Sequence, residues 1–248
     1  SFQLTHVVAE ECFSFASNYW GYGNQSFWGS TPCSKCGKDG VQSPINIQTA
    51  TAAVGPAHLL ERLGGRAVRM GNVTWRYEYP LVNASLQTTP RGWGVQILPP
   101  YDTSTTTSFF GKDYRLLGFK FVSPAENTLD GASYDMEIQH VHESDDRQRL
   151  ITSVMLRVGL VPNNSYVAQI WESFPSNGSN TVYKEITSPY YGAFPQDRSF
   201  YAFNGSITEP PCDETVWMVF KEPRWISRAQ RDWYRLRTNE TSSGILRY

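Results

Sequence analysis

The sequence lacks the features that mark several large functional classes. Its 248 residues contain no apolar run near the roughly 20 residues that a membrane-spanning helix needs. The formal net charge is −1, which argues against bulk electrostatic attraction to nucleic acid or to an anionic membrane. No signal peptide is visible at Ser1, so we expect a mature form or an ectodomain fragment. We expect no nucleic-acid partner, and membrane attachment only through an anchor outside this chain.

Cysteine is scarce, with four residues in the chain. Cys33 and Cys36 have a C-x-x-C spacing, which is found in redox motifs and as half of some metal sites. No βαβ pattern surrounds this pair and no second C-x-x-C follows it. An even number of cysteines suits two disulfides, which we favour over redox chemistry.

Sequons for N-linked glycosylation are frequent. Asn-x-Ser/Thr with no proline in the middle begins at seven asparagines. We expect Asn204 to be too buried for modification, and the six other candidates are Asn24, Asn72, Asn83, Asn163, Asn177 and Asn239. Sequons together with paired cysteines favour the secretory route. We therefore expect an extracellular or cell-surface protein.

Short strand-like runs with alternating polarity dominate the chain. They cover Tyr114–Val122, Ser133–Val141, Thr152–Gly159 and Thr215–Phe220. Polar segments at Asp102–Ser108 and Pro175–Asn180 are typical of loops. Strands separated by Gly, Pro and Asn turns predict a mostly β protein. No repeat or linker divides the chain, so residues 1–248 are expected to form a single domain.

Several blocks resemble one known family in order and spacing. Trp20–Tyr22 and Trp28 precede Gln42–Ile47, and Gly205–Glu214 precedes Val216–Lys221. Between them lie Tyr114–Asn127 and Tyr134–His142, which resemble the two active-site strands of the α-carbonic anhydrases. The resemblance is clearest over residues 18–238. It implies a large central twisted sheet, mainly antiparallel, with short helices outside.

In that family three histidines on those two strands hold a catalytic zinc. The matching positions here carry Lys120, Val122 and Gln139. An ammonium has no lone pair, valine has no donor atom, and one amide oxygen is a weak ligand. We therefore expect no zinc, no other cofactor and no carbonate dehydratase activity.

The positions around the implied zinc site are partly retained. Glu126, Glu137 and Thr208 match residues that orient the zinc ligands in the family, whereas Glu209 stands where a second threonine is usual. Trp93 falls near the proton-shuttling histidine and is expected at the altered cleft. We expect Lys120 to replace the cation, paired with Glu137, Glu126 or Glu209; the alternative is that it extends to solvent along an open cleft.

Three further expectations concern the cysteines, the histidines and the arginines. The resemblance implies a Cys36–Cys212 disulfide, which leaves Cys12–Cys33 as the second pair. His140 and His142 share the strand face opposite Gln139, where a pair of core or partly exposed histidines is favoured over a new metal site. On the helix-like segment Ser227–Arg237, a possible basic patch for a sulfated glycan or acidic protein consists of Arg228, Arg231 and Arg235. A solvated helix face with nearby acids is the favoured interpretation of that patch.

Three functions remain open from the sequence. The leading hypothesis is a catalytically inactive extracellular binding, adhesion or receptor module for a macromolecular ligand, either a surface protein or a glycan. The second is an enzyme with a relocated metal or with Lys120 as nucleophile or base, which nearby glutamates disfavour because they stabilise the ammonium. The third is a structural or storage role.

Overall fold

The computed structural model describes residues 29–30, 35–37, 42–54, 68–70, 73–89, 92–175 and 181–238. In these ranges the chain is mostly β, as the sequence predicts. A mixed sheet of thirteen strands runs in the order β13-β5-β6-β8-β11-β12-β15-β14-β3-β2, with β16, β7 and β4 attached beside this path. Among the described residues nine strand pairs of this sheet are antiparallel, and β12–β15, β12–β16 and β2–β3 are parallel.

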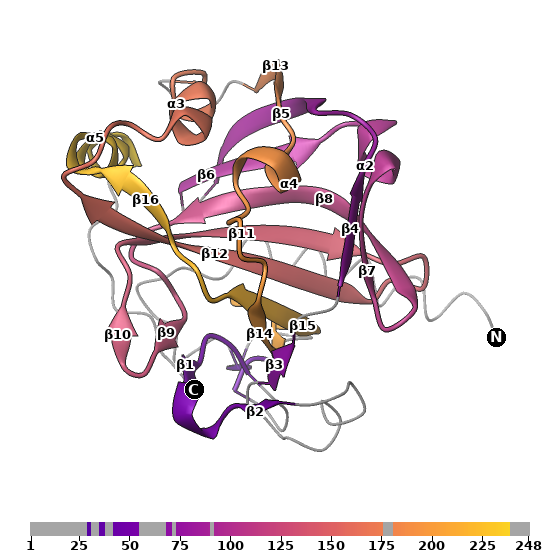
Figure 1. Ribbon diagram of the computed structural model, residues 1–248. Helices are drawn as coiled ribbons and strands as arrows, with labels where there is room; N and C mark the ends of the chain where they lie inside the picture. The colour runs from indigo at the N-terminus through magenta and orange to yellow at the C-terminus, as the bar shows by residue number, and fades with distance from the viewer. Residues whose placement is uncertain are drawn as a thin grey trace.

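The sheet occupies the centre of the molecule, and short helices lie outside it (Figure 1). The strands of the main path are β13 (Val182–Thr187), β5 (Leu81–Thr89), β6 (Gly92–Ile97), β8 (Lys112–Val122), β11 (Met136–Glu143), β12 (Arg149–Gly159), β15 (Glu214–Phe220), β14 (Phe200–Ser206), β3 (Val68–Met70) and β2 (Ala53–Val54). Beside it lie β16 (Arg224–Ser227), β7 (Thr105–Phe109) and β4 (Thr74–Tyr77). A small second sheet consists of β1 (Asn46–Ile47), β9 (Thr128–Leu129) and β10 (Ala132–Ser133).

The helices are short. They are η2 (Thr49–Thr51), α2 (Tyr101–Ser104), α3 (Ser165–Trp171), α4 (Pro189–Gly192) and α5 (Arg228–Thr238). Ser227 begins α5 with reciprocal hydrogen bonds to Gln230: its hydroxyl accepts from the Gln230 N–H at 3.1 Å, and its own N–H donates to the Gln230 Oε1 at 3.2 Å. This is the capping-box arrangement, and it explains why the predicted helix starts here. No helix in the described ranges is long and apolar enough to cross a bilayer.

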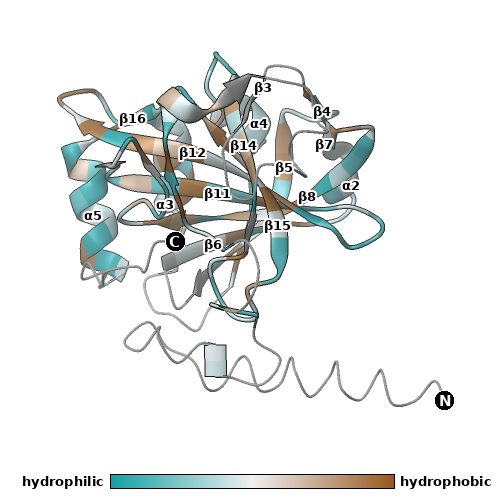
Figure 2. Ribbon diagram, turned by 90° about the horizontal axis from the view of Figure 1, so that it is seen from below, coloured by the Kyte–Doolittle hydropathy of each residue, from teal (hydrophilic) through white to brown (hydrophobic). Residues whose placement is uncertain are grey.

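Apolar residues pack on both faces of the sheet. The larger core lies on one face and includes Phe119, Phe121, Trp171 and Tyr234. A smaller cluster on the opposite face includes Trp217 and joins the small sheet through Ile45, Ile47 and Leu129. Figure 2 shows hydrophobic colouring through the central strands and hydrophilic colouring along much of α5. Alternate residues of each central strand therefore face two different environments.

One predicted loop is wrong. The segment 102–108 lies instead in α2 and in β7, which pairs with both β4 and β8. Thr105, Thr107 and Phe109 are buried at every second position, and β-branched threonines fit such a pleated, half-buried strand. Polar composition alone therefore misassigned a strand whose hydroxyls face the interior. The other predicted loop falls mostly outside the described residues.

Candidate functional site

Strand register brings the three predicted zinc-ligand positions together. Lys120 of β8 lies opposite Gln139 of β11, which lies opposite Ser153 of β12. Two residues further along β8, Val122 lies opposite Glu137. Directly paired residues and residues two apart share one sheet face, so these five side chains face the same side. That face is opposite the larger core.

Lys120 is held by an ion pair. Its Nζ donates to the Glu209 Oε1 at 2.8 Å, and the two side chains are 19% and 27% exposed. Glu209 follows β14 and reaches back across the sheet face to the lysine. The predicted ion pair is therefore confirmed, with Glu209 as the partner. Since the ammonium carries no lone pair, it supplies no metal ligand in this state.

Gln139 is also engaged. Its Nε2 donates to the Glu126 Oε2 at 2.7 Å, and both residues are completely or almost completely buried. Val122 is 1% exposed and has only methyl groups to offer. Among the described residues no three His, Cys, Asp or Glu side chains gather in a metal-binding arrangement.

Glu137 is the centre of a second set of hydrogen bonds. Its carboxylate accepts from Ser153 Oγ at 2.5 Å, from the Asn127 side chain at 3.1 Å and from the Glu126 N–H at 2.8 Å. Burial raises the pKa of this carboxyl, the neighbouring Glu126 raises it further, and the hydrogen bonds from Ser153 and Asn127 lower it. The bonds tie the segment after β8 to the sheet. Ser153 and Asn127 were not predicted as donors from the sequence, although the register of two adjacent strands was the signal for Ser153.

Thr208, the third retained position, is 5% exposed. Its Oγ1 is buried and has no hydrogen-bond partner within the described part of the chain. Lys120 also lines a cavity of about 450 Å³ together with Gln87, Gln96 and Asp102. Lys120 therefore both lines this open cavity and pairs with Glu209.

Trp93 does not belong to this cavity, which corrects the sequence-based expectation. It is 2% exposed, lies opposite Phe121 in the register, and stacks on Phe174 with ring centroids 4.4 Å apart. Its face is that of the larger core. Gly94, the next residue, lies opposite Lys120 and lines the cavity instead. A shift of one residue in the sequence comparison moves a strand residue to the opposite face.

His140 and His142 lie on the core face, as predicted, and are completely buried. His142 Nε2 lies 2.7 Å from the Tyr190 hydroxyl, and His140 packs between Phe119 and Phe194. Burial is the largest cause that lowers the pKa of His140 to about 3 and that of His142 to about 4. Both rings are therefore neutral structural groups at physiological pH.

The predicted basic patch does not form an open surface. Arg231 is 18% exposed and contacts Asp135 at 3.5 Å and Asp232 at 2.7 Å. Arg235 donates through Nε to Ser123 Oγ at 3.2 Å, and of the three arginines Arg228 alone is exposed. The arginines are therefore largely committed to contacts within the chain. The favoured interpretation was a solvated helix face with nearby acids. The acids are present, but Arg231 and Arg235 are partly buried.

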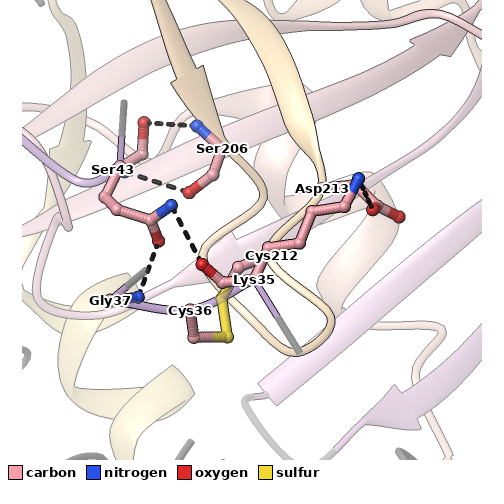
Figure 3. Close-up of a disulfide and its surroundings, with 8 residues drawn as sticks. Lys35, Cys36, Gly37, Ser43, Ser206, Cys212 and Asp213 are labelled. Atoms are coloured by element: carbon pink, nitrogen blue, oxygen red, sulfur yellow. Dashed lines mark hydrogen bonds and ion pairs between the residues drawn. A yellow bond between two sulfur atoms is a disulfide. The ribbon is translucent and has the colours of Figure 1, made fainter. Parts of the chain in front are cut away.

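The Cys36–Cys212 disulfide is confirmed and joins residues 176 apart in sequence. Beside it, Ser43 and Ser206 exchange hydrogen bonds, each backbone N–H donating to the other hydroxyl at 3.1 and 3.2 Å (Figure 3). Cys12–Cys33 lies outside the described residues, as do the sequons at Asn24, Asn72, Asn177 and Asn239. Asn83 and Asn163 are exposed, whereas Asn204 is partly buried.

A mostly β fold with a single dominant mixed sheet and a cavity on one sheet face is the architecture of the carbonic anhydrases. A comparison with known protein families matches residues 23–244 to the eukaryotic-type carbonic anhydrases. The chain therefore belongs to this family, and the sequence-based assignment is confirmed.

Individual relatives and solved structures with similarity to this chain carry different names. A carbonic anhydrase of Neisseria gonorrhoeae is 28% identical and aligns over 93% of this chain and 87% of its own length. Dioscorin DB3L of Dioscorea polystachya is 29% identical over 79% of this chain and 66% of its own length. Among solved structures, the α-carbonic anhydrase of Thermovibrio ammonificans superposes with a TM-score of 0.79 at 24% identity, covering 93% of this chain and 95% of the other, which shows the shared fold.

Proposed function

We propose that this protein is a member of the carbonic anhydrase family that does not hydrate CO2 and acts as an extracellular binding module. The observation that carries the proposal is the ion pair between Glu209 and Lys120, a residue that lines the cavity. Lys120, Val122 and Gln139 then stand where the family's zinc-binding histidines stand. Relatives of this chain carry two names, carbonic anhydrase and dioscorin, so the proposal rests on the residues of the site and not on the name of a relative.

The residues present do not fit a zinc ion. Catalytic zinc takes three protein ligands and a water whose pKa falls to about 7. Lys120 is an ammonium already paired with Glu209, and the Gln139 amide group donates to Glu126. Val122 contributes no donor atom. Without the metal there is no activated water, so this cavity has no nucleophile for CO2.

Zinc titration tests this proposal directly. We expect calorimetry to detect no zinc binding to the wild-type cavity. The triple variant Lys120→His, Val122→His and Gln139→His provides the positive control, since it restores three imidazoles on one sheet face. Zinc binding by the wild-type chain that is lost in Gln139→Leu would refute the proposal. Binding unaffected by substitutions at all three positions would locate a metal site elsewhere and refute the loss of metal chemistry.

The binding role rests on the secretory features of the chain. A disulfide and the two exposed sequons at Asn83 and Asn163 favour an extracellular setting, where such a domain meets surface proteins and glycans. Lysine-based catalysis is disfavoured because the Lys120 Nζ is already engaged by Glu209 at 2.8 Å. A screen of the secreted protein against cell-surface proteins and glycans tests the role. The absence of binding to any cell-surface protein and to any glycan would favour a structural or storage role instead.

A further inference from the structure

Asn83 lies on the same sheet face as the cavity. Its neighbours on β5, Val82 and Ala84, are 1% and 0% exposed and belong to the larger core. Strand alternation therefore turns Asn83 to the opposite face, which it shares with Gln87. Asn83 is exposed, and Gln87 lines the 450 Å³ cavity. The sequon thus lies beside the cavity and not at a remote loop.

The register of three strands fixes how close the sequon comes. Ser85 lies opposite Gln96 of β6, and Gln87 lies opposite Gly94, which in turn lies opposite Lys120 of β8. With about 3.3 Å per residue along a strand and about 4.8 Å between strands, Asn83 lies roughly 8 Å from Gln96. It is separated from Lys120 by roughly 16 Å by the same count. A branched glycan of several sugar units spans such distances.

The cavity has the chemistry to hold sugar hydroxyls. Gln87 and Gln96 are exposed amides with donors and acceptors, and Asp102 has a buried Oδ1 without a hydrogen-bond partner in the described ranges. Gly94 and Gly118 line the cavity between these groups and add no side chain to it. A Cβ at Gly118 would meet the Val95 carbonyl oxygen at 2.2 Å, so the floor is packed too closely there for any side chain.

We propose that Asn83 carries an N-linked glycan whose first sugars lie across the mouth of this cavity and contact Gln96 and Gln87. The inference rests on the extracellular setting of the proposed function. The glycan would close the cavity to macromolecules while small molecules still pass. A macromolecular ligand would then dock on a surface other than the cavity.

Asn163 is the matched control sequon. It is also exposed, but its Oδ1 accepts from the Ser227 hydroxyl at 2.6 Å, beside the start of α5. It lines a different, smaller hollow with Trp171 and Trp233. Trp171 and Trp233 pack with the larger core, on the sheet face opposite the cavity, so removal of a glycan at Asn163 should leave the cavity unchanged.

The experiment uses the full chain secreted from eukaryotic cells, with glycan occupancy measured by mass spectrometry of glycopeptides. Gln96→Cys places a thiol in the cavity, and Leu160→Cys places one at a position that is 99% exposed. Labelling rates are compared for a small maleimide and a polymer-linked maleimide. We expect the polymer reagent to label the Gln96→Cys variant several-fold more slowly than the Leu160→Cys variant. Asn83→Gln should remove the difference, and Asn163→Gln should not.

A second measurement needs no new cysteine. Native enzymatic release of the Asn83 glycan should be slower than release of the Asn163 glycan, and equal after denaturation. Equal labelling and release rates with Asn83 occupied would overturn the proposal. An unmodified Asn83 in a chain glycosylated at other sequons would also overturn it, while leaving the extracellular setting intact. A secreted chain without any glycan would also overturn the inference, and would remove the sequons as support for the extracellular assignment.

Discussion

Lys120 and Glu209 form an ion pair of 2.8 Å across 89 residues of sequence, on the cavity face of the central sheet. Both side chains are mostly withdrawn from solvent. Leaving either charge alone in such a place is costly, because its lost hydration is no longer compensated. The pair therefore explains how this site keeps a positive charge beside retained carboxylates without a metal.

Replacing Lys120 by Met should lower stability. The side chains are 19% and 27% exposed, so solvent screening places the effect between that of a surface pair and that of a buried pair. We expect a loss of about 1–2 kcal/mol in the free energy of unfolding, or roughly 2–8 °C in melting temperature.

Lys112→Met is the control, because Lys112 pairs with Asp146 at 2.6 Å while its side chain is 35% exposed and its partner 57% exposed. Differential scanning calorimetry should show a smaller loss for this variant. Equal melting temperatures for wild type and Lys120→Met would contradict a stabilising pair.

Ser153→Ala should destabilise the fold through Glu137. The substitution removes the hydroxyl that donates to this carboxylate at 2.5 Å. We expect a loss of about 1.5–3 kcal/mol, the usual range for a hydrogen bond to a charged group. Thr152→Val is the matched control on the adjacent residue, whose buried Oγ1 has no partner among the described residues. Chemical denaturation should show this control to be neutral or stabilised; a larger loss for Thr152→Val would reverse the assignment.

Stability should fall as the solution becomes acidic, because two buried histidines must stay neutral. The pKa values of about 3 for His140 and about 4 for His142 lie below the ordinary value of 6.5. Their contribution is therefore complete above pH 6.5 and is lost as the pH falls toward the folded values. By pH 5 we expect about 2 kcal/mol lost for each ring.

The effect of Glu137 on the pH dependence of stability has the opposite sign. Its raised pKa makes its contribution complete below the ordinary 4.5 and lost as the pH rises through the folded value. Comparing the unfolding free energies of the wild type and of a histidine variant between pH 7.5 and pH 5 separates the histidine contribution from that of Glu137. His140→Leu should remove about half of the acid-dependent loss; an unchanged slope would contradict the burial of a neutral His140.

Removing the Cys36–Cys212 disulfide should cost more than any single side-chain contact. The bond closes a loop across 176 residues of sequence, for which chain entropy alone gives about 5 kcal/mol. The Cys36→Ala and Cys212→Ala double variant should unfold at much lower denaturant concentration. Lys35→Ala, which removes the neighbouring exposed pair with Asp213, should change stability little. Similar midpoints for the two variants would refute a stabilising role for the disulfide.

Local pattern predicted much of the fold. Alternation in β8 and β11 placed Lys120 and Gln139 on one face and His140 on the other, because the two-residue strand period leaves no other arrangement. The family resemblance supplied the disulfide partner. Composition did not predict strand β7, because a threonine-rich segment is compatible with either a loop or a strand. The pairing of this segment with β4 and β8 makes it a strand.

Details that depend on distant contacts could not be predicted. Trp93 was predicted on the wrong sheet face. Because a glycine lies on each side of it, its alignment with the family sequence is ambiguous by one residue, and a shift of one residue changes the face. Arg231 is partly buried through its contact with Asp135, which lies 96 residues earlier in the sequence. The choice of Glu209 over Glu126 or Glu137 as the lysine partner likewise depends on how a distant segment returns across the sheet.

The most direct test is metal content and CO2 hydration measured on the same sample, purified without chelator. The proposed function predicts no stoichiometric zinc and no hydration above the buffer rate, because Lys120, Val122 and Gln139 provide no set of three imidazoles. Stoichiometric zinc with hydration activity would contradict the proposed function.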